Sequence, residues 1–348
     1  MKNFDWNAVL GRERGQRPAG ALNAFSAPTP RPDLTGLSLA DVSAEVIARL
    51  AAGEGFTRDR DLVLAGQLLD LLGTHVDVHL NRFARRRYFD LTQPILAHLT
   101  PGELRNATVV DLGAGSLNPF VFGFIFLMLG ARRAYAVDLD AVQDPARAIR
   151  ALATAAEWLL VDPVRLTGLR GVERHAVLDN LHGFDLALLA AGNPDGVAGD
   201  RLVYLSEAIE ALSIGDGEAD LVSSVSLLEH VDDVESVIDS LWRITKPGGL
   251  GHHVVDFVDH RLYGGQVDNP FEFLKIMSPD PIVHGCNRVR SGQLRTLFER
   301  RGFVVERMDA CRTDPLTDAE QRQFVEPYRS MSREDLTMTC ARVFVRRP

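Results

Sequence analysis

Residues 109–123, VVDLGAGSLNPFVFG, decide the fold, because a β-branched run ends there in two glycines that are one residue apart. A strand that passes through a glycine-containing turn into a helix favours a loop against which a nucleotide-like ligand can lie. Pro119 suits the first turn of that helix, and Gly130 suits its end. The stretch therefore predicts a ligand-binding loop at the carboxyl end of a strand.

Strand and helix patterns alternate from this loop to the end of the chain. Strands are expected over residues 107–113, 133–140, 200–206, 219–227, 249–257, 302–310 and 336–347, and helices over 118–131, 233–245 and 291–302. Such alternation predicts a doubly wound, mainly parallel α/β sheet.

Three regions of the chain differ in composition and in the spacing of their apolar residues. Residues 1–37 are rich in Arg, Pro and Gly and are expected to form an extended or poorly ordered arm. Residues 38–100 show apolar residues at helical spacing, which predicts an N-terminal helical cap. Residues 101–348 form the sheet domain, with inserted helices at about 141–200 and a further insertion at about 260–290.

Composition and charge limit the classes of partner and site that the sequence supports. The 348 residues carry a formal net charge of −9, which disfavours a nucleic-acid partner. Cys286, Cys311 and Cys340 stand alone in sequence, so their spacing indicates neither disulfides nor a thiolate zinc site, and a cytoplasmic location is expected. The most apolar window, residues 120–129, is too short to span a bilayer, so no membrane partner is expected. The oligomeric state stays open, with a homodimer among the alternatives.

Two positions indicate whether the loop binds a dinucleotide or a ligand without a pyrophosphate. Counting GxGxxG from Gly113 places Asn118 where a dinucleotide loop has its third glycine, which packs helix on strand near a pyrophosphate. Asp138 ends the next strand, where a carboxylate can accept both hydroxyl hydrogens of a ribose, or cap a helix instead. A ligand with a ribose but no pyrophosphate fits both observations.

The motifs VVDLGAGS, AVDLD and SLLEHVDDVESVIDSLWRITKPGGLGHHVVDF, in this order, resemble those of class I S-adenosylmethionine-dependent methyltransferases. The resemblance is close over residues 105–260 and looser to the end. It implies a Rossmann-like, doubly wound seven-stranded sheet whose last strand is antiparallel, with S-adenosyl-L-methionine as the cofactor.

The resemblance also implies a cofactor site. Asp138 would hold the ribose hydroxyls and Leu139 would pack on the adenine. The acidic position that reaches the adenine amine in many family members falls on Ala208, or on Glu207 after a shift of one residue. The expected cofactor-binding residues are Asp111, Gly113, Ala114, Gly115, Asp138, Leu139, Glu207, Ala208, Ile209, Ser226 and Leu227.

The candidate catalytic residues are His230 and His260, which follow the fourth and fifth strands. Either imidazole suits a general base near neutral pH, although His230 can merely border the cofactor and His260 can be structural. A divalent cation on Asp256, Asp259 and His260 is a weaker alternative, and no metal is assigned.

Acceptor contacts are expected from the segment after the fifth strand. The predicted substrate-binding residues are Asp259, Tyr263, Asn287 and Arg288, and Phe271 and Phe273 are expected to help wall the pocket. A plain capping loop is the alternative for this segment.

Two further patterns have simpler interpretations. His252 and His253 lie within a strand pattern and are expected to pack or hydrogen-bond there. The basic cluster Arg82–Arg87 is either a solvated helix face or a lid over an anionic acceptor, with Tyr88 over the cofactor.

The function expected is methyl transfer to a small-molecule acceptor, on an oxygen of a sugar or another polyhydroxylated metabolite. The alternatives are transfer to nitrogen or sulfur, a nicotinamide-dependent oxidoreductase, and a non-catalytic cofactor-binding protein. The chain has no DPPY-like sequence, and Cys286 lacks the preceding proline typical of cytosine-C5 methylating enzymes. Both observations argue against a nucleic-acid acceptor.

Overall fold

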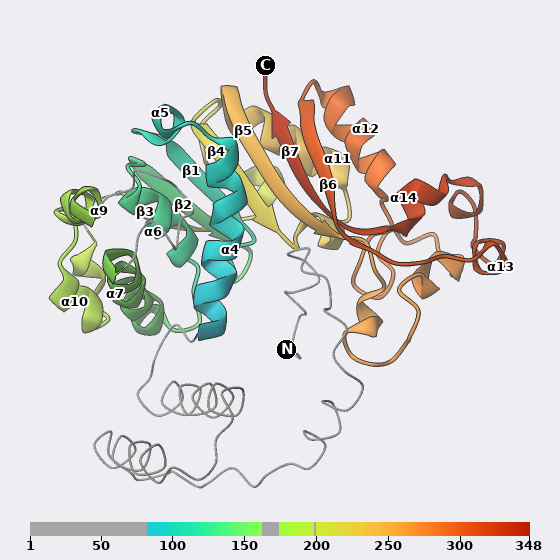
Figure 1. Cartoon of the computed structure of the whole chain (residues 1–348), viewed down its shortest axis with the longest axis horizontal. Coiled ribbons are helices and arrows are strands. Elements are labelled where there is room, and N and C mark those ends of the chain that lie inside the picture. The colour runs from blue at the N-terminus through green and yellow to red at the C-terminus, as the bar shows by residue number, and fades with distance from the viewer. Residues whose placement is uncertain (1–81, 162–173, 198–199) are drawn as a thin grey trace, which may run out of the picture.

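The computed structural model describes residues 82–161, 174–197 and 200–348 (Figure 1). The expected arm and the part of the expected cap before residue 82 lie outside these residues. None of the helices in these ranges is long and apolar enough to cross a membrane.

One seven-stranded sheet forms the centre of the molecule, in the order β3-β2-β1-β4-β5-β7-β6 (Figure 1). Neighbours from β3 to β5 pair in parallel, whereas β7 is antiparallel to both β5 and β6. The predicted sheet is therefore confirmed, including its antiparallel last strand. The strands are β1 (Thr108–Leu112), β2 (Arg133–Asp138), β3 (Leu202–Ser206), β4 (Ala219–Val225), β5 (Thr245–Asp256), β6 (Val304–Thr313) and β7 (Met338–Arg346).

Helices cover both faces of the sheet, so the central strands are apolar on both sides. One face carries α4 (Arg82–His98), α6 (Val121–Met128), α7 (Pro145–Val161) and α9 (Arg174–Leu181), and the other carries α11 (Val234–Ile244) and α12 (Ser291–Arg301). Every residue of α6 is buried. A Cβ on Gly123 would lie 2.7 Å from Ala134 Cβ, so only glycine lets this helix approach β2 so closely.

Further helices come from the expected insertion and from short segments between the main elements. The expected insertion at about 141–200 contains α7, α9 and α10 (Leu186–Ala190). The remaining short helices are α5 (Pro101–Leu104), α13 (Asp318–Gln321) and α14 (Arg333–Thr337).

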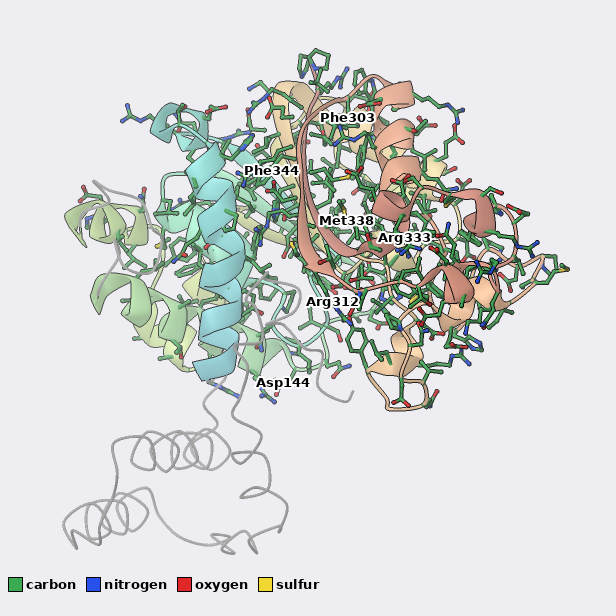
Figure 2. All side chains as sticks on the ribbon, turned by 45° about the vertical axis from the view of Figure 1, so that its right-hand side comes forward. Asp144, Phe303, Arg312, Arg333, Met338 and Phe344 are labelled. Atoms are coloured by element: carbon green, nitrogen blue, oxygen red, sulfur yellow. The ribbon has the colours of Figure 1, made fainter. Side chains whose placement is uncertain are left out.

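Helix α4 is fixed to the sheet at its carboxyl end. Ile95 and Leu96 are buried in the core of this face. The His98 ring stacks on Phe344 of β7, with 4.3 Å between the ring centroids. Phe344 is labelled in Figure 2. His98 Nε2 lies 2.7 Å from a Glu306 carboxylate oxygen. Near the other end, Tyr88 donates to the Asn118 carbonyl, beside the glycine loop. The Arg82–Arg87 cluster falls in the first turns of α4, and its lid role stays a prediction.

Residues 257–290 and 314–337 together form an accessory unit beyond the ends of β5, β6 and β7, at the α13 and α14 end of Figure 1. Its own small apolar core contains Phe271 and Phe273, each 1% exposed. The expectation that these two rings wall an acceptor pocket is therefore wrong, because the segment between β6 and β7 supplies Phe324 and Tyr328 to cover them.

Arg290 joins the accessory unit to the sheet. Its side chain is 0% exposed, and its guanidinium donates to the carbonyls of Phe257, Leu336 and Met338 while lying over the Phe257 ring. Burial lowers the pKa of Arg290 to about 10, so the group stays charged at neutral pH.

We predict that Arg290→Met lowers the free energy of unfolding by about 3 kcal/mol or more, because three buried carbonyls lose their donor. Chemical denaturation followed by circular dichroism measures this loss. The control is Arg295→Met, which removes a half-exposed arginine from α12, the helix that follows Arg290. Equal effects of the two substitutions would show that Arg290 has no special structural role.

We also predict a pH-dependent contribution from Glu306. Burial favours a higher pKa for this carboxyl, but hydrogen bonds from Arg346 and His98 outweigh burial and lower the pKa. A carboxyl with a lowered folded-state pKa stabilises the fold above its unfolded pKa, and this stabilisation is lost as the pH falls through the folded-state pKa. Glu306→Gln should therefore cost about 0.5–1 kcal/mol at pH 7 and little in acid.

Thermal unfolding of wild type and Glu306→Gln across this pH range tests the effect, with the exposed Glu299→Gln as control. A stability difference for Glu306→Gln that is constant from pH 7 to strong acid contradicts the assignment.

Candidate functional site

The glycine loop lies where the order of the strands reverses, between β1 and β4. Gly113 and Gly115 both have positive φ, +68° and +79°. A Cβ on Gly113 would lie 3.2 Å from a methyl carbon of Leu227, which follows β4. A Cβ on Gly115 would meet nothing within 4 Å, so the backbone there faces open space. The loop thus leaves room for a ligand at the carboxyl edge of the sheet.

Asp138 connects this loop to the end of β2. Its carboxylate accepts the Gly115 N–H at 2.8 Å and the Asp140 N–H at 3.2 Å, one at each oxygen. Each oxygen keeps acceptor capacity beyond these bonds, enough for two hydroxyl groups. Leu139, directly after it, is 73% exposed. An exposed apolar side chain beside a carboxylate matches the expected adenine and ribose contacts.

Two buried polar atoms near the loop have no hydrogen-bond partner within residues 82–161, 174–197 and 200–348. They are Asn118 Oδ1, on the helix side of the loop, and Ser226 Oγ, after β4. Ser226 also has a φ of +52°, an uncommon conformation for a residue other than glycine and one that clusters at ligand sites. A ligand that offers a ribose, a flat base and a polar amino-acid end fits this combination of open backbone, carboxylate and unpaired polar atoms.

The residues after β3 lie beside Asp138, but the polar groups of Glu207 are occupied by hydrogen bonds to neighbouring residues. The Glu207 N–H donates to the Asp138 carbonyl at 3.0 Å. The Glu207 carboxylate accepts the N–H and the hydroxyl of Ser213, each at 2.8 Å, and so closes a local turn. Ala208 offers no acidic group, and Ile209 is buried in the core. An acidic contact to the adenine amine therefore stays a prediction.

The fold brings three side chains together from three separate segments. His230 ends the 3₁₀ turn Leu228–His230 after β4, and His260 begins the 3₁₀ turn His260–Leu262 after β5. Their rings meet edge to face, with 4.8 Å between centroids. Cys286 comes from the accessory unit, and its sulfur and one ring nitrogen of each histidine all lie within 4.8 Å of one another. We call His230, His260 and Cys286 the histidine–cysteine cluster.

A tight turn over residues 283–286 presents Cys286 to the two histidines. Val283 and Cys286 exchange both backbone hydrogen bonds, at 2.8 and 3.2 Å. The central residues His284 and Gly285 both have positive φ, 55° and 82°, as a type I′ turn requires. The Gly285 carbonyl accepts from His230 Nδ1 at 2.7 Å. Since a carbonyl only accepts, Nδ1 carries the proton, and the lone pair of neutral His230 is on Nε2.

The predicted substrate-binding residues have mainly structural contacts. The Asn287 amide donates to the carbonyls of Leu228 and Val231, and its backbone N–H donates to the Glu229 carbonyl at 2.7 Å. Arg288 donates to the carbonyls of Ile276 and Ser278 and lies over the Tyr328 ring. Asn287 thus clamps the turn with Cys286 against the turn with His230, and Arg288 holds the accessory unit together.

The other two predicted substrate-binding residues, Asp259 and Tyr263, also bind other groups of the protein. Asp259 is 1% exposed and forms an ion pair with Arg261. The Tyr263 hydroxyl donates to a buried Asp256 carboxylate oxygen. Asp256 and Asp259 are thus held by different partners, which disfavours the expected alternative of a cation between them and His260. Acceptor contacts by Asp259, Tyr263, Asn287 and Arg288 stay predictions.

Buried acidic groups surround the cluster. Glu229 is 1% exposed, and neither of its carboxylate oxygens has a side-chain hydrogen-bond partner among the described residues. Burial, together with the Asp256 carboxylate, raises the pKa of Glu229 well above its usual range. Burial and the carboxyl groups of Glu229 and Asp256 raise the pKa of the Cys286 thiol.

Desolvation lowers the pKa of His230, so this imidazole is neutral at pH 7. His260 Nε2 is buried without a hydrogen bond, 3.6 Å from an Asp256 oxygen.

Sequence reasoning did not place Cys286 in this site, and it named Glu229 beside His230 after the fourth strand without giving Glu229 a role. The motif SLLEH indicates that Glu229 follows a strand, but only the packing shows that its carboxylate is buried. By contrast, His252 and His253 behave as expected, because both are buried in β5 and pair with Ser223 and Ser224.

Comparison with known proteins agrees with this site. A family model described as a methyltransferase domain matches residues 80–307, more than half of the chain. The chain belongs to the methyltransferase domain family. Together with the strand order and with the glycine loop and Asp138 at the carboxyl edge of the sheet, which we call the cofactor cradle, the match identifies the chain as a class I S-adenosylmethionine-dependent methyltransferase. No curated protein sequence matches the chain.

Solved structures of methyltransferases are similar to the chain at low sequence identity. A putative S-adenosylmethionine-dependent methyltransferase from Listeria monocytogenes is 11% identical, with 76% of this chain and 98% of that chain covered and a TM-score of 0.39. A putative sarcosine dimethylglycine methyltransferase from Galdieria sulphuraria is 18% identical, with 76% and 87% covered and a TM-score of 0.40. A geranyl diphosphate C-methyltransferase from Streptomyces coelicolor is 13% identical, with 86% and 88% covered and a TM-score of 0.41.

We predict that Asp138→Ala weakens the binding of S-adenosylhomocysteine by about 100-fold, because two hydrogen bonds to a charged group are worth about 1.5 kcal/mol each. Isothermal titration calorimetry measures the affinity. Asp140→Ala is the matched control, since this neighbouring exposed aspartate contributes its backbone to the local turn. An Asp138→Ala affinity within twofold of wild type would contradict the ribose assignment.

Proposed function

We propose that this methyltransferase transfers a methyl group to an oxygen of a small polyhydroxylated molecule, with His230 and His260 as the catalytic residues that face this oxygen. The observation that carries the proposal is the edge-to-face pair of histidines at the carboxyl ends of β4 and β5. His230 is three residues beyond Leu227, whose side chain contacts the glycine loop. The pair is therefore next to the expected cofactor cradle.

S-adenosyl-L-methionine supplies an electrophilic methyl group when it is bound. The chain itself must align the acceptor and deal with the proton that a hydroxyl loses. His230 is accessible to solvent and neutral, with its Nε2 lone pair available. Asp256, 3.6 Å from His260 Nε2, lies where it can stabilise positive charge on that ring.

The site favours oxygen over the alternative acceptors that the sequence leaves open. An amine or thiolate acceptor often needs no adjacent proton acceptor, whereas a hydroxyl acceptor does. Two imidazoles with a carboxylate behind one of them suit the hydroxyl. The negative net charge argues against a polyanionic acceptor.

The proposal is tested by incubating the full chain with S-adenosylmethionine labelled in its methyl group and a metabolite extract. We expect label in a methyl ether, identified by mass spectrometry. His230→Asn and His260→Asn should each reduce turnover by about 10²-fold or more with that acceptor at saturation. The control His284→Asn exchanges a histidine whose positive φ asparagine tolerates.

Two results overturn the proposal. One is label found only on nitrogen, sulfur or carbon of the product. The other is turnover in both His230→Asn and His260→Asn that matches the His284→Asn control. Binding of S-adenosylhomocysteine to each variant checks that the cofactor site is intact.

A further inference from the structure

The histidine–cysteine cluster combines two imidazoles and a thiol in a small volume. The three potential ligand atoms lie within 4.8 Å of one another. In a tetrahedral zinc site, bonds of about 2.0–2.3 Å put ligand atoms roughly 3.3–3.8 Å apart. A contraction of about 1 Å, within the reach of side-chain rotation, brings these atoms to that spacing.

We propose that His230, His260 and Cys286 bind a zinc ion, with a fourth coordination position left open to the acceptor. The choice of metal follows from the donor atoms. A thiolate and two imidazoles select zinc or a similar late transition metal, whereas Mg²⁺ and Ca²⁺ require oxygen ligands. Three protein ligands with one open position are typical of catalytic rather than structural zinc sites.

Hydrogen bonds already orient one of these ligands. Metal-binding histidines generally donate their second ring N–H to a carbonyl or a carboxylate. His230 donates Nδ1–H to the Gly285 carbonyl at 2.7 Å, which leaves Nε2 free for the metal. The same turn carries Cys286, so one turn positions two ligands. Asn287 clamps that turn against the backbone at Leu228, Glu229 and Val231, so the two ligands are held together.

Charge around the cluster favours a cation. Glu229 is buried with no side-chain partner among the described residues for either carboxylate oxygen, and Asp256 lies 3.6 Å from His260 Nε2. Carboxylate oxygens this close to the cluster can accept hydrogen bonds from its ligands and so orient those ligands around a cation. On binding, the Cys286 thiol releases its proton to solvent and its sulfur coordinates as thiolate.

The role of the ion rests on the proposed function. The open position lies beside the histidines that face the acceptor, and coordination to zinc lowers the pKa of a bound oxygen acid toward neutrality. The acceptor hydroxyl would give its proton to solvent, and its oxygen would then be the nucleophile. When the ion is bound, His230 and His260 act in the proposed reaction as its ligands, and the ion takes over from a free imidazole the task of making the hydroxyl acidic.

Metal binding is tested without any acceptor. The full chain, freed of metal by chelator and dialysed, is titrated with Zn²⁺, and bound metal is counted by inductively coupled plasma mass spectrometry. Co²⁺ in place of Zn²⁺ gives a thiolate-to-metal charge-transfer absorption. We expect one equivalent of retained Zn²⁺ and this absorption in wild type, and loss of both in Cys286→Ser and His260→Asn.

Cys311→Ser is the matched control, because it removes a free thiol outside the cluster and should keep both signals. Circular dichroism and S-adenosylhomocysteine binding show that each variant is folded. The metal site is overturned if wild type retains no Zn²⁺, or if Cys286→Ser keeps the charge-transfer absorption. Methyl transfer that persists in metal-free protein would overturn only the catalytic role of the ion, and label on an atom other than oxygen would overturn only the proposed acceptor.

Discussion

The parallel pairing of β1 with β4 is the constraint on which the rest of the site depends. The chain builds β2 and β3 on one side of β1 and then returns to add β4 on the other. This reversal brings the glycine loop after β1 against Leu227 after β4. Because parallel strands end at the same edge, Asp138 after β2 and the histidines after β4 and β5 also gather there. The sheet topology thus brings the glycine loop, Asp138 and the two histidines to the same edge of the sheet.

A second constraint comes from the accessory unit, which the sheet does not specify. Arg290 links the segment directly after β5 to the start of β7 through the carbonyls of Phe257, Leu336 and Met338, and Asn287 fastens its turn to the segment after β4. Buried polar bonds of this kind are costly to lose, so they fix the position of Cys286 firmly. The accessory unit therefore completes the polar site and closes it on one side.

Much of the fold could be predicted from the sequence, because the signals are local. The β-branched runs, the glycines after β1 and Asp138 at the end of β2 each follow from neighbouring residues. The partners of Cys286 could not be predicted, since His230 and His260 are on other segments and only packing brings them near. Phe271 and Phe273 were misassigned for the same reason: their cover comes from residues after β6. Asn287 and Arg288 have donor groups suited to a ligand, but backbone carbonyls occupy them.

We propose that the cofactor lies at the β1–β4 junction with its reactive end toward the histidine pair. A crystal structure of the chain with S-adenosylhomocysteine tests this claim most directly. The account predicts ribose hydroxyls on Asp138, adenine on Leu139 and the sulfur facing His230 and His260. A ligand bound elsewhere, such as in the hollow of about 390 Å³ lined by Asn106 and Arg133 at the opposite edge of the sheet, would contradict it.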